Sequence, residues 1–188
     1  MDDLVRQAMA KWPHVPDCYA WLGLDARGQW YMRDDRCQAL GPFDADVPGA
    51  KGSLLSHEKL IEFIQRNYEP DAFGCWYFQN GPQRVYVELE ATPWIWRLDE
   101  RLCITSHTGR EAEFQACLLD ESGRVYLHTS IGLGLVHSLD VVWVAQAVEE
   151  GRWQVQEVLS TELAAMYHYI RSPERHQREK AGDRFPGA

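Results

Sequence analysis

Short apolar and aromatic runs, separated by turn-forming residues, dominate the hydrophobic pattern of the chain. Two such runs flank Asp25 and Gly28, and two more flank Asn80 and Gly81. These residues supply the positive φ angles of tight turns, so each pair of runs is typical of a β-hairpin. The predicted strands are 18–24 with 29–32, 75–79 with 84–90, and then 94–98, 102–105, 112–119 and 153–158.

Four other segments have apolar residues at helical spacing. A helix is predicted over 2–12, a second over 56–64 with Ser56 as its N-cap, and a last one over 160–170. Residues 138–150 favour a helix closed by Gly151, but the β-branched run that begins at Val141 leaves a strand open. We therefore expect an α+β fold: antiparallel hairpins in a sheet or open barrel with three to four packed helices.

One pattern occurs twice. Leu24-Asp25-x-x-Gly28 continues to Tyr31, and Leu119-Asp120-x-x-Gly123 continues in the same way to Tyr126. One interpretation is that unrelated β-hairpins use the same residue types in their turns, without any duplication. The other is a duplicated hairpin–helix–strand unit, with an N-terminal half over 1–100 and a C-terminal half over 101–171. Residues 172–188, nearly without apolar side chains, are expected to form a flexible charged tail.

The 188 residues carry a net charge of −9, with 19 basic and 28 acidic side chains. This balance disfavours nucleic acid and anionic membranes as partners. The acidic N-terminus has no continuous apolar stretch, which argues against a secretory signal peptide. Five cysteines, an odd number without a C-x-x-C pair, suit a reducing compartment. We expect a cytoplasmic protein.

No motif predicts catalysis or a cofactor. The seven histidines show none of the usual zinc-ligand spacings, and the glycine-rich stretches complete no phosphate-binding loop. Cys37, with arginine neighbours, has the best prospect of a lowered thiol pKa, but acidic residues flank it and no partner base is evident. The sequence therefore predicts no metal, no cofactor and no catalytic residue.

The aromatic and acidic residues of 86–96 are the best candidates for binding a ligand. Glu88 and Glu90 lie on one face of a predicted strand with Tyr86, and Trp94 and Trp96 share a face of the next. A solvated sheet face and an ordinary aromatic core are the competing interpretations. The candidate ligand-binding residues are Tyr86, Glu88, Glu90, Trp94 and Trp96.

The segments 12–31, 52–55, 80–94 and 132–136 together resemble a proteobacterial family of small proteins known only as a domain of unknown function. The order of helix and hairpins also resembles, through 52–61, 84–88 and 158–170, a bacterial family built from repeated motifs and linked to signal transduction. Neither resemblance implies catalytic residues.

These observations favour a non-enzymatic module that binds an unknown small molecule or protein, with a role in signalling or regulation. One alternative is a hydrolase-like enzyme using Glu88 and Glu90 with a histidine such as His107 or His128. Another is a structural subunit of a homo-oligomer, which would need a large self-complementary apolar face.

Overall fold

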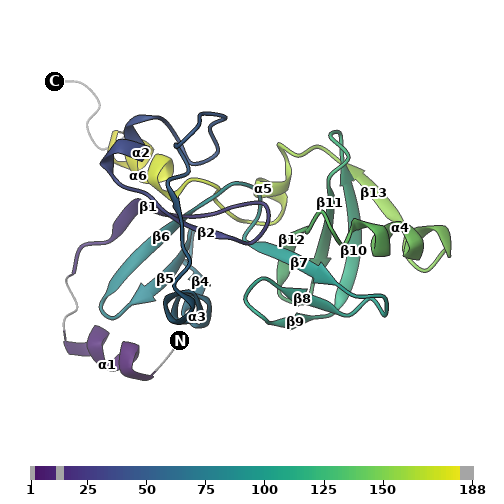
Figure 1. Cartoon of the computed structure of the whole chain (residues 1–188), viewed down its shortest axis with the longest axis horizontal. Coiled ribbons are helices and arrows are strands. Elements are labelled where there is room, and N and C mark those ends of the chain that lie inside the picture. The colour runs from purple at the N-terminus through teal and green to yellow at the C-terminus, as the bar shows by residue number, and fades with distance from the viewer. Residues whose placement is uncertain (1–2, 12–14, 183–188) are drawn as a thin grey trace. The chain divides into compact units, whose positions relative to one another are not determined.

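The computed structural model describes residues 3–11 and 15–182, and these form two compact units. The first unit contains the chain up to residue 25, residues 29–90 and the chain from residue 169 onward. The second contains residues 26–28 and 91–168. Each unit is built around its own mixed sheet (Figure 1).

The sheet of the first unit has the strand order β3-β2-β1-β6-β5-β4. Strand β1 pairs in parallel with β6, and every other neighbouring pair is antiparallel. The strands are β1 (Cys18–Leu24), β2 (Trp30–Met32), β3 (Ser53–Leu54), β4 (Tyr68–Pro70), β5 (Trp76–Asn80) and β6 (Gln83–Leu89), and the helices are α1 (Asp3–Lys11), α2 (Asp35–Ala39), α3 (Glu58–Arg66) and α6 (Pro173–Gly182).

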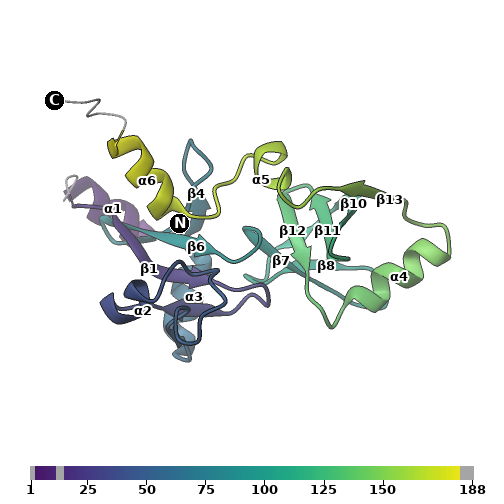
Figure 2. The same cartoon turned by 90° about the horizontal axis from the view of Figure 1, so that it is seen from above.

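Helices α3 and α6 pack on this sheet in different ways. The amphipathic α3 contacts β5 and buries Ile64, and Phe63 meets Phe78 edge to face. Helix α6 contacts β1 and β6, yet it is polar along its length and the one residue it buries is Pro173 (Figure 2). Because α6 has no apolar stripe, polar contacts must hold it against the sheet.

The sheet of the second unit has the order β13-β10-β11-β12-β7-β8-β9. Its parallel pairs are β10 with β13 and β12 with β7. The strands are β7 (Trp94–Leu98), β8 (Ile104–Ser106), β9 (Glu111–Ala112), β10 (Phe114–Asp120), β11 (Val125–Thr129), β12 (Gly132–Val136) and β13 (Val155–Val158), and the helices are α4 (Val141–Glu149) and α5 (Leu163–Met166).

The α+β class and both predicted hairpins are confirmed. The sequence did not indicate that the strands divide between two sheets or that three pairs are parallel. Residues 141–149 form a helix, which decides the alternative left open by the β-branched run. The turn residues that predict the hairpins cannot reveal the parallel pairs, because a parallel pair joins strands that are far apart in the chain.

Several helix boundaries differ from the predicted ones. His57 rather than Ser56 caps α3, since its Nδ1 accepts from the Leu60 N–H at 3.3 Å. The helix predicted over 160–170 is reduced to α5, because His168 adopts φ 53° and Ile170 bridges to Cys75. The expected loose tail contains α6 instead. Residues 2 and 12 of the first predicted helix, and 183–188 of the tail, lie outside the described residues.

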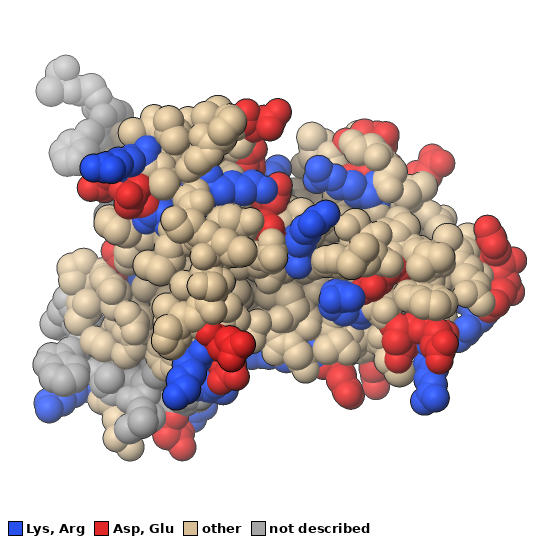
Figure 3. Space-filling view, viewed as in Figure 1, with Lys and Arg blue, Asp and Glu red and all other residues tan. Residues whose placement is uncertain are grey.

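No helix within residues 3–11 and 15–182 combines the length and the apolar character needed to span a bilayer. On the face shown in Figure 3, acidic and basic side chains are intermingled, so neither sign of charge gathers into a separate patch there.

Candidate functional site

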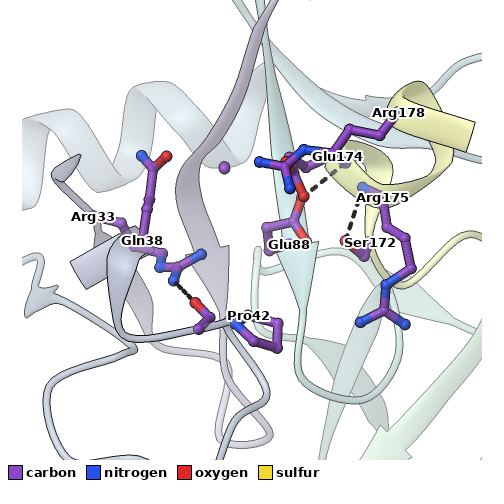
Figure 4. Close-up of a pocket in the computed structure, with 10 residues that line it drawn as sticks. Arg33, Gln38, Pro42, Glu88, Ser172, Glu174, Arg175 and Arg178 are labelled. Carbon is purple, nitrogen blue, oxygen red and sulfur yellow. Dashed lines mark hydrogen bonds and ion pairs between the residues drawn. The ribbon is translucent and has the colours of Figure 1, made fainter. Parts of the chain in front are cut away.

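A cavity of about 270 Å³ lies in the first unit, between the sheet and the start of α6. Figure 4 shows Arg33, Gln38 and Pro42 on one side of it. The lining residues come from β1, from the segment around α2, from β6 and from α6, and they are Ala20, Arg33, Gln38, Gly41, Pro42, Glu88, Ser172, Glu174, Arg175 and Arg178. We call this space the arginine cavity.

Arg33 is the most unusual residue of this cavity, because its side chain is charged yet only 4% exposed. Its guanidinium donates to three backbone carbonyl oxygens, those of Ala50 at 2.8 Å, Gly41 at 2.5 Å and Cys37 at 3.2 Å. No carboxylate of the described residues forms an ion pair with it within 4.0 Å. Carbonyl dipoles therefore stabilise a buried positive charge that makes no ion pair, although the charge of Arg33 also acts on Glu88 of the same cavity.

Glu88 holds the first turn of α6 from across the cavity. Its Oε1 accepts from the Glu174 N–H at 3.1 Å, and Ser172 caps the same turn by accepting from the Arg175 N–H at 3.3 Å. Both bonds satisfy N–H groups that have no partner inside the helix. Burial raises the pKa of Glu88, although hydrogen bonds from Ser172 and the Glu174 backbone partly oppose that shift.

The remaining polar groups of the arginine cavity are mainly hydrogen-bond donors. Arg178 is paired with Glu174, whereas Arg175 has no carboxylate partner within 4.0 Å in the described part of the chain. The Gln38 side-chain nitrogen is buried and, among residues 3–11 and 15–182, has no hydrogen-bond partner. An arginine offers up to five N–H donors in a fixed fork, which suits carboxylate and phosphate oxygens.

Ala20 places an irregularity at the cavity wall. It adopts φ 66°, and the pairing of β1 with β6 changes register between Cys18 and Leu22. A residue with a Cβ is strained at this φ, and bulges of this kind are frequent beside functional sites. The local irregularity therefore lies directly at the wall of the arginine cavity.

The candidate residues named from the sequence fall in separate places. Glu88 lines the arginine cavity, and Tyr86, two residues earlier on β6, lines a neighbouring cavity. Glu90 instead forms an ion pair with Lys51 at 2.7 Å. Trp94 and Trp96 belong to the second unit, where they are 2% and 0% exposed.

The two tryptophans have structural partners of their own. The Trp94 indole N–H donates to the Ile131 carbonyl, and that of Trp96 donates to the Leu127 carbonyl, both at 2.9 Å. Their rings stack at 6.1 Å. These contacts satisfy the polar atom of each ring and place its apolar body in the core of the second unit.

Sequence reasoning missed Arg33, Gln38, Arg175 and Arg178. The first two lie between the predicted strand 29–32 and the predicted helix 56–64, where no element was expected, and the other two lie in the segment predicted as a flexible charged tail. The Ser172-Pro173 pair was the available signal for α6, because serine at the N-cap followed by proline is a strong helix start. No local signal distinguishes a buried arginine from an exposed one.

The residues of the hydrolase alternative are not arranged as an acid–base pair. Glu88 caps α6 and Glu90 pairs with Lys51. His107 and His128 belong to the second unit, and burial lowers the pKa of His107 to about 3, so its imidazole is neutral at ordinary pH. In residues 3–11 and 15–182, no three His, Cys, Asp or Glu side chains are grouped as metal ligands.

The chain belongs to the family DUF2944, described as "Protein of unknown function (DUF2946)", whose model matches residues 1–181. A comparison with curated proteins found no match. Among solved structures, a DUF1285 family protein from Silicibacter pomeroyi is similar, with 11% identity and a TM-score of 0.47. That similarity covers 78% of this chain and 84% of the other.

Proposed function

We propose that this protein is a non-enzymatic binding module whose first unit holds a small anionic ligand in the arginine cavity. The observation that carries the proposal is the buried Arg33 guanidinium, which donates to three carbonyl oxygens and forms no ion pair within 4.0 Å with a described carboxylate. A buried charge is costly unless it is closely paired, so an anion that contacts Arg33 in the cavity would offset that cost.

The cavity limits the size of the ligand. A volume of about 270 Å³ corresponds to about nine water molecules at about 30 Å³ each, which suits a small carboxylate or a phosphate compound rather than a large cofactor. Arg175 and Arg178 supply further donors from α6. A ligand that contacts both Arg33 and Arg175 would connect the sheet to α6.

Such a connection supports a regulatory role. Helix α6 has no apolar stripe and is held by polar contacts such as the one from Glu88. A ligand that binds only the docked helix would increase the population of that state. Ligand binding would then change the surface that α6 presents, which is the behaviour expected of a signalling or regulatory module.

Isothermal titration calorimetry at low ionic strength tests the proposal, with disodium succinate and inorganic phosphate as the probes. We expect at least one of them to bind the wild-type protein. Arg175→Gln should weaken that binding about 10-fold, as expected for the loss of a charge-assisted hydrogen bond. Arg152→Gln removes an exposed arginine of the second unit and should leave binding unchanged.

Arg33→Lys provides a second variant, because lysine keeps the charge but cannot bond three carbonyls in the same geometry. Binding should again weaken about 10-fold, with circular dichroism used to confirm that the variant folds. The proposal is wrong if neither anion binds the wild-type protein, or if Arg152→Gln and Arg175→Gln weaken binding equally.

A further inference from the structure

A second cavity, of about 500 Å³, lies in the first unit on the other side of α6. Residues 174, 175 and 178 of the helix line the arginine cavity, whereas residues 173, 176, 177 and 180 line this one. Its walls come from β1, β5, β6, α6 and the turn 70–73, and the aromatic ones are Tyr19, Phe73, Tyr77 and Tyr86. We call this space the tyrosine cavity.

Two of the aromatic rings stack face to face at this wall. Tyr19 and Tyr86 stack with centroids 4.5 Å apart and planes only 4° apart. Tyr19 faces this cavity while its neighbour Ala20 faces the arginine cavity. Successive side chains of a regular strand point to opposite faces, so the irregularity at Ala20 is what allows both residues to line cavities beside α6.

The polar groups of α6 supply the tyrosine cavity with two nitrogens that can donate hydrogen bonds. The Lys180 ammonium lies 3.4 Å from the centroid of the Phe73 ring and forms no ion pair with a described carboxylate. The His176 Nε2 is buried and has no hydrogen-bond partner among the described residues. The Lys180 ammonium and the His176 Nε2 can each donate a hydrogen bond to a ligand oxygen.

The Asp71 carboxylate of the same cavity already has donors for both oxygens. Asp71 accepts from the Tyr86 hydroxyl at 3.1 Å and from the backbone N–H groups of Phe73 and Cys75. Burial raises the pKa of Asp17, and the charge of Asp71 adds to that shift while Arg84 opposes it. The raised pKa of Asp17 weakens the repulsion that its carboxyl group would exert on an anion.

We propose that the tyrosine cavity is a second binding site, which takes a planar aromatic carboxylate. The ring would extend the Tyr19–Tyr86 stack on the outer face of Tyr19, and the carboxylate would accept from Lys180 and His176. Its volume lies within the range usual for small-molecule sites. Burial raises the pKa of the Cys75 thiol in its lining to about 12, which keeps this thiol from acting as a nucleophile.

Calorimetric titration of the full chain with sodium benzoate tests this proposal. Benzoate should bind more tightly than cyclohexanecarboxylate, which has the charge without the flat π-face, and more tightly than benzylamine, which has the ring with the opposite charge. Lys180→Gln should weaken benzoate binding about 10-fold, and Tyr19→Leu should reduce the preference for benzoate over cyclohexanecarboxylate. Lys59→Gln, on the exposed surface of α3, is the matched control.

The two cavities are distinguished by Arg175→Gln. This variant should weaken succinate or phosphate binding and leave benzoate binding unchanged, because Arg175 lines the arginine cavity alone. Loss of benzoate binding in Arg175→Gln but not in Lys180→Gln would overturn the second site. The same conclusion follows if benzoate does not bind the wild-type protein or binds no better than benzylamine.

Discussion

The Tyr126 hydroxyl donates a 2.8 Å hydrogen bond to Oδ2 of Asp120, six residues earlier in the same hairpin. The other carboxylate oxygen of Asp120 accepts from the backbone N–H groups of Ser122 and Arg124. One buried side chain therefore closes the turn and anchors the returning strand. The first hairpin repeats the arrangement, with Asp25 accepting from the Gln29 N–H and bonded to Tyr31.

This relationship gives a physical reason for each residue of the repeated pattern. The aspartate closes the turn, Gly28 and Gly123 adopt φ 80° and 78°, and the tyrosine returns to the aspartate. A positive φ strains residues that have a Cβ, so glycine is required there. Two hairpins can acquire these residues independently, and a duplication of the halves remains a prediction.

Tyr126→Phe should destabilise the protein by about 1–2 kcal/mol, because it leaves the buried Asp120 carboxylate without one of its donors. Urea unfolding followed by circular dichroism measures the change. Tyr167→Phe is the control in the same unit, since no hydrogen bond of the Tyr167 hydroxyl is found within the described chain; the interpretation fails if both variants lose the same stability.

Glu88→Ala should release α6 from the sheet, since it removes the acceptor for the Glu174 N–H. Hydrogen exchange of the backbone amides in 173–182 should accelerate about 10-fold, equivalent to about 1.4 kcal/mol. Glu88→Gln retains a side-chain oxygen and should exchange nearly as slowly as the wild type. Equal exchange in all three proteins would show that Glu88 does not hold the helix.

The difference in stability between Glu88→Gln and the wild type should depend on pH. Because burial raises the folded-state pKa of Glu88, the folded protein binds the proton more tightly than the unfolded chain. The stability that this tighter proton binding provides is fully present below pH 4.5, the ordinary pKa of a glutamate. It is lost as pH rises through the folded-state pKa of Glu88. Urea titrations should show Glu88→Gln gaining stability relative to the wild type as pH rises from 4 to 7.

Gly134→Ala should destabilise the second unit by about 3 kcal/mol, because the added Cβ would lie 2.4 Å from Nε1 of Trp96 and 2.7 Å from the Trp94 carbonyl oxygen. Both groups are fixed in the core of that unit. Thermal unfolding measures the loss. Gly182→Ala is the control, since a Cβ there meets no described atom within 4 Å, and a comparable loss in the control would contradict the steric explanation.

His107 should make the protein acid-sensitive. Its pKa is lowered by burial to about 3, whereas an unfolded histidine titrates near 6.5, so the unfolded chain binds the extra proton between these values. Stability should fall as pH decreases from 6.5 towards 3, with a slope of up to about 1.4 kcal/mol per pH unit from this residue. The variant His107→Asn should lack the part of this pH dependence that His107 causes. Urea titrations at several pH values measure the free energy of unfolding and would detect the difference.

The two hairpins and helix α3 could be derived from the sequence, because their causes lie within a few neighbouring residues. Alternating apolar positions predicted the hairpins, and the aspartates and glycines of the turns predicted where each strand reverses. The apolar face of 56–64 predicted α3 for the same reason. Trp94 and Trp96, named from the sequence as candidate ligand-binding residues with an ordinary core as the competing interpretation, are buried in the second unit.

The tertiary structure alone decided the site, because it joins residues with no local pattern in common. The pairing of β1 with β6 and the docking of α6 bring Arg33, Glu88 and Arg175 to one cavity, across as many as 142 positions of the chain (175 − 33). Burial of Arg33 depends on backbone carbonyl groups of the irregular segment that follows it, at Gly41 and Ala50. Hydrophobic periodicity does not encode such polar contacts, so neither α6 nor the buried arginine could be derived from it.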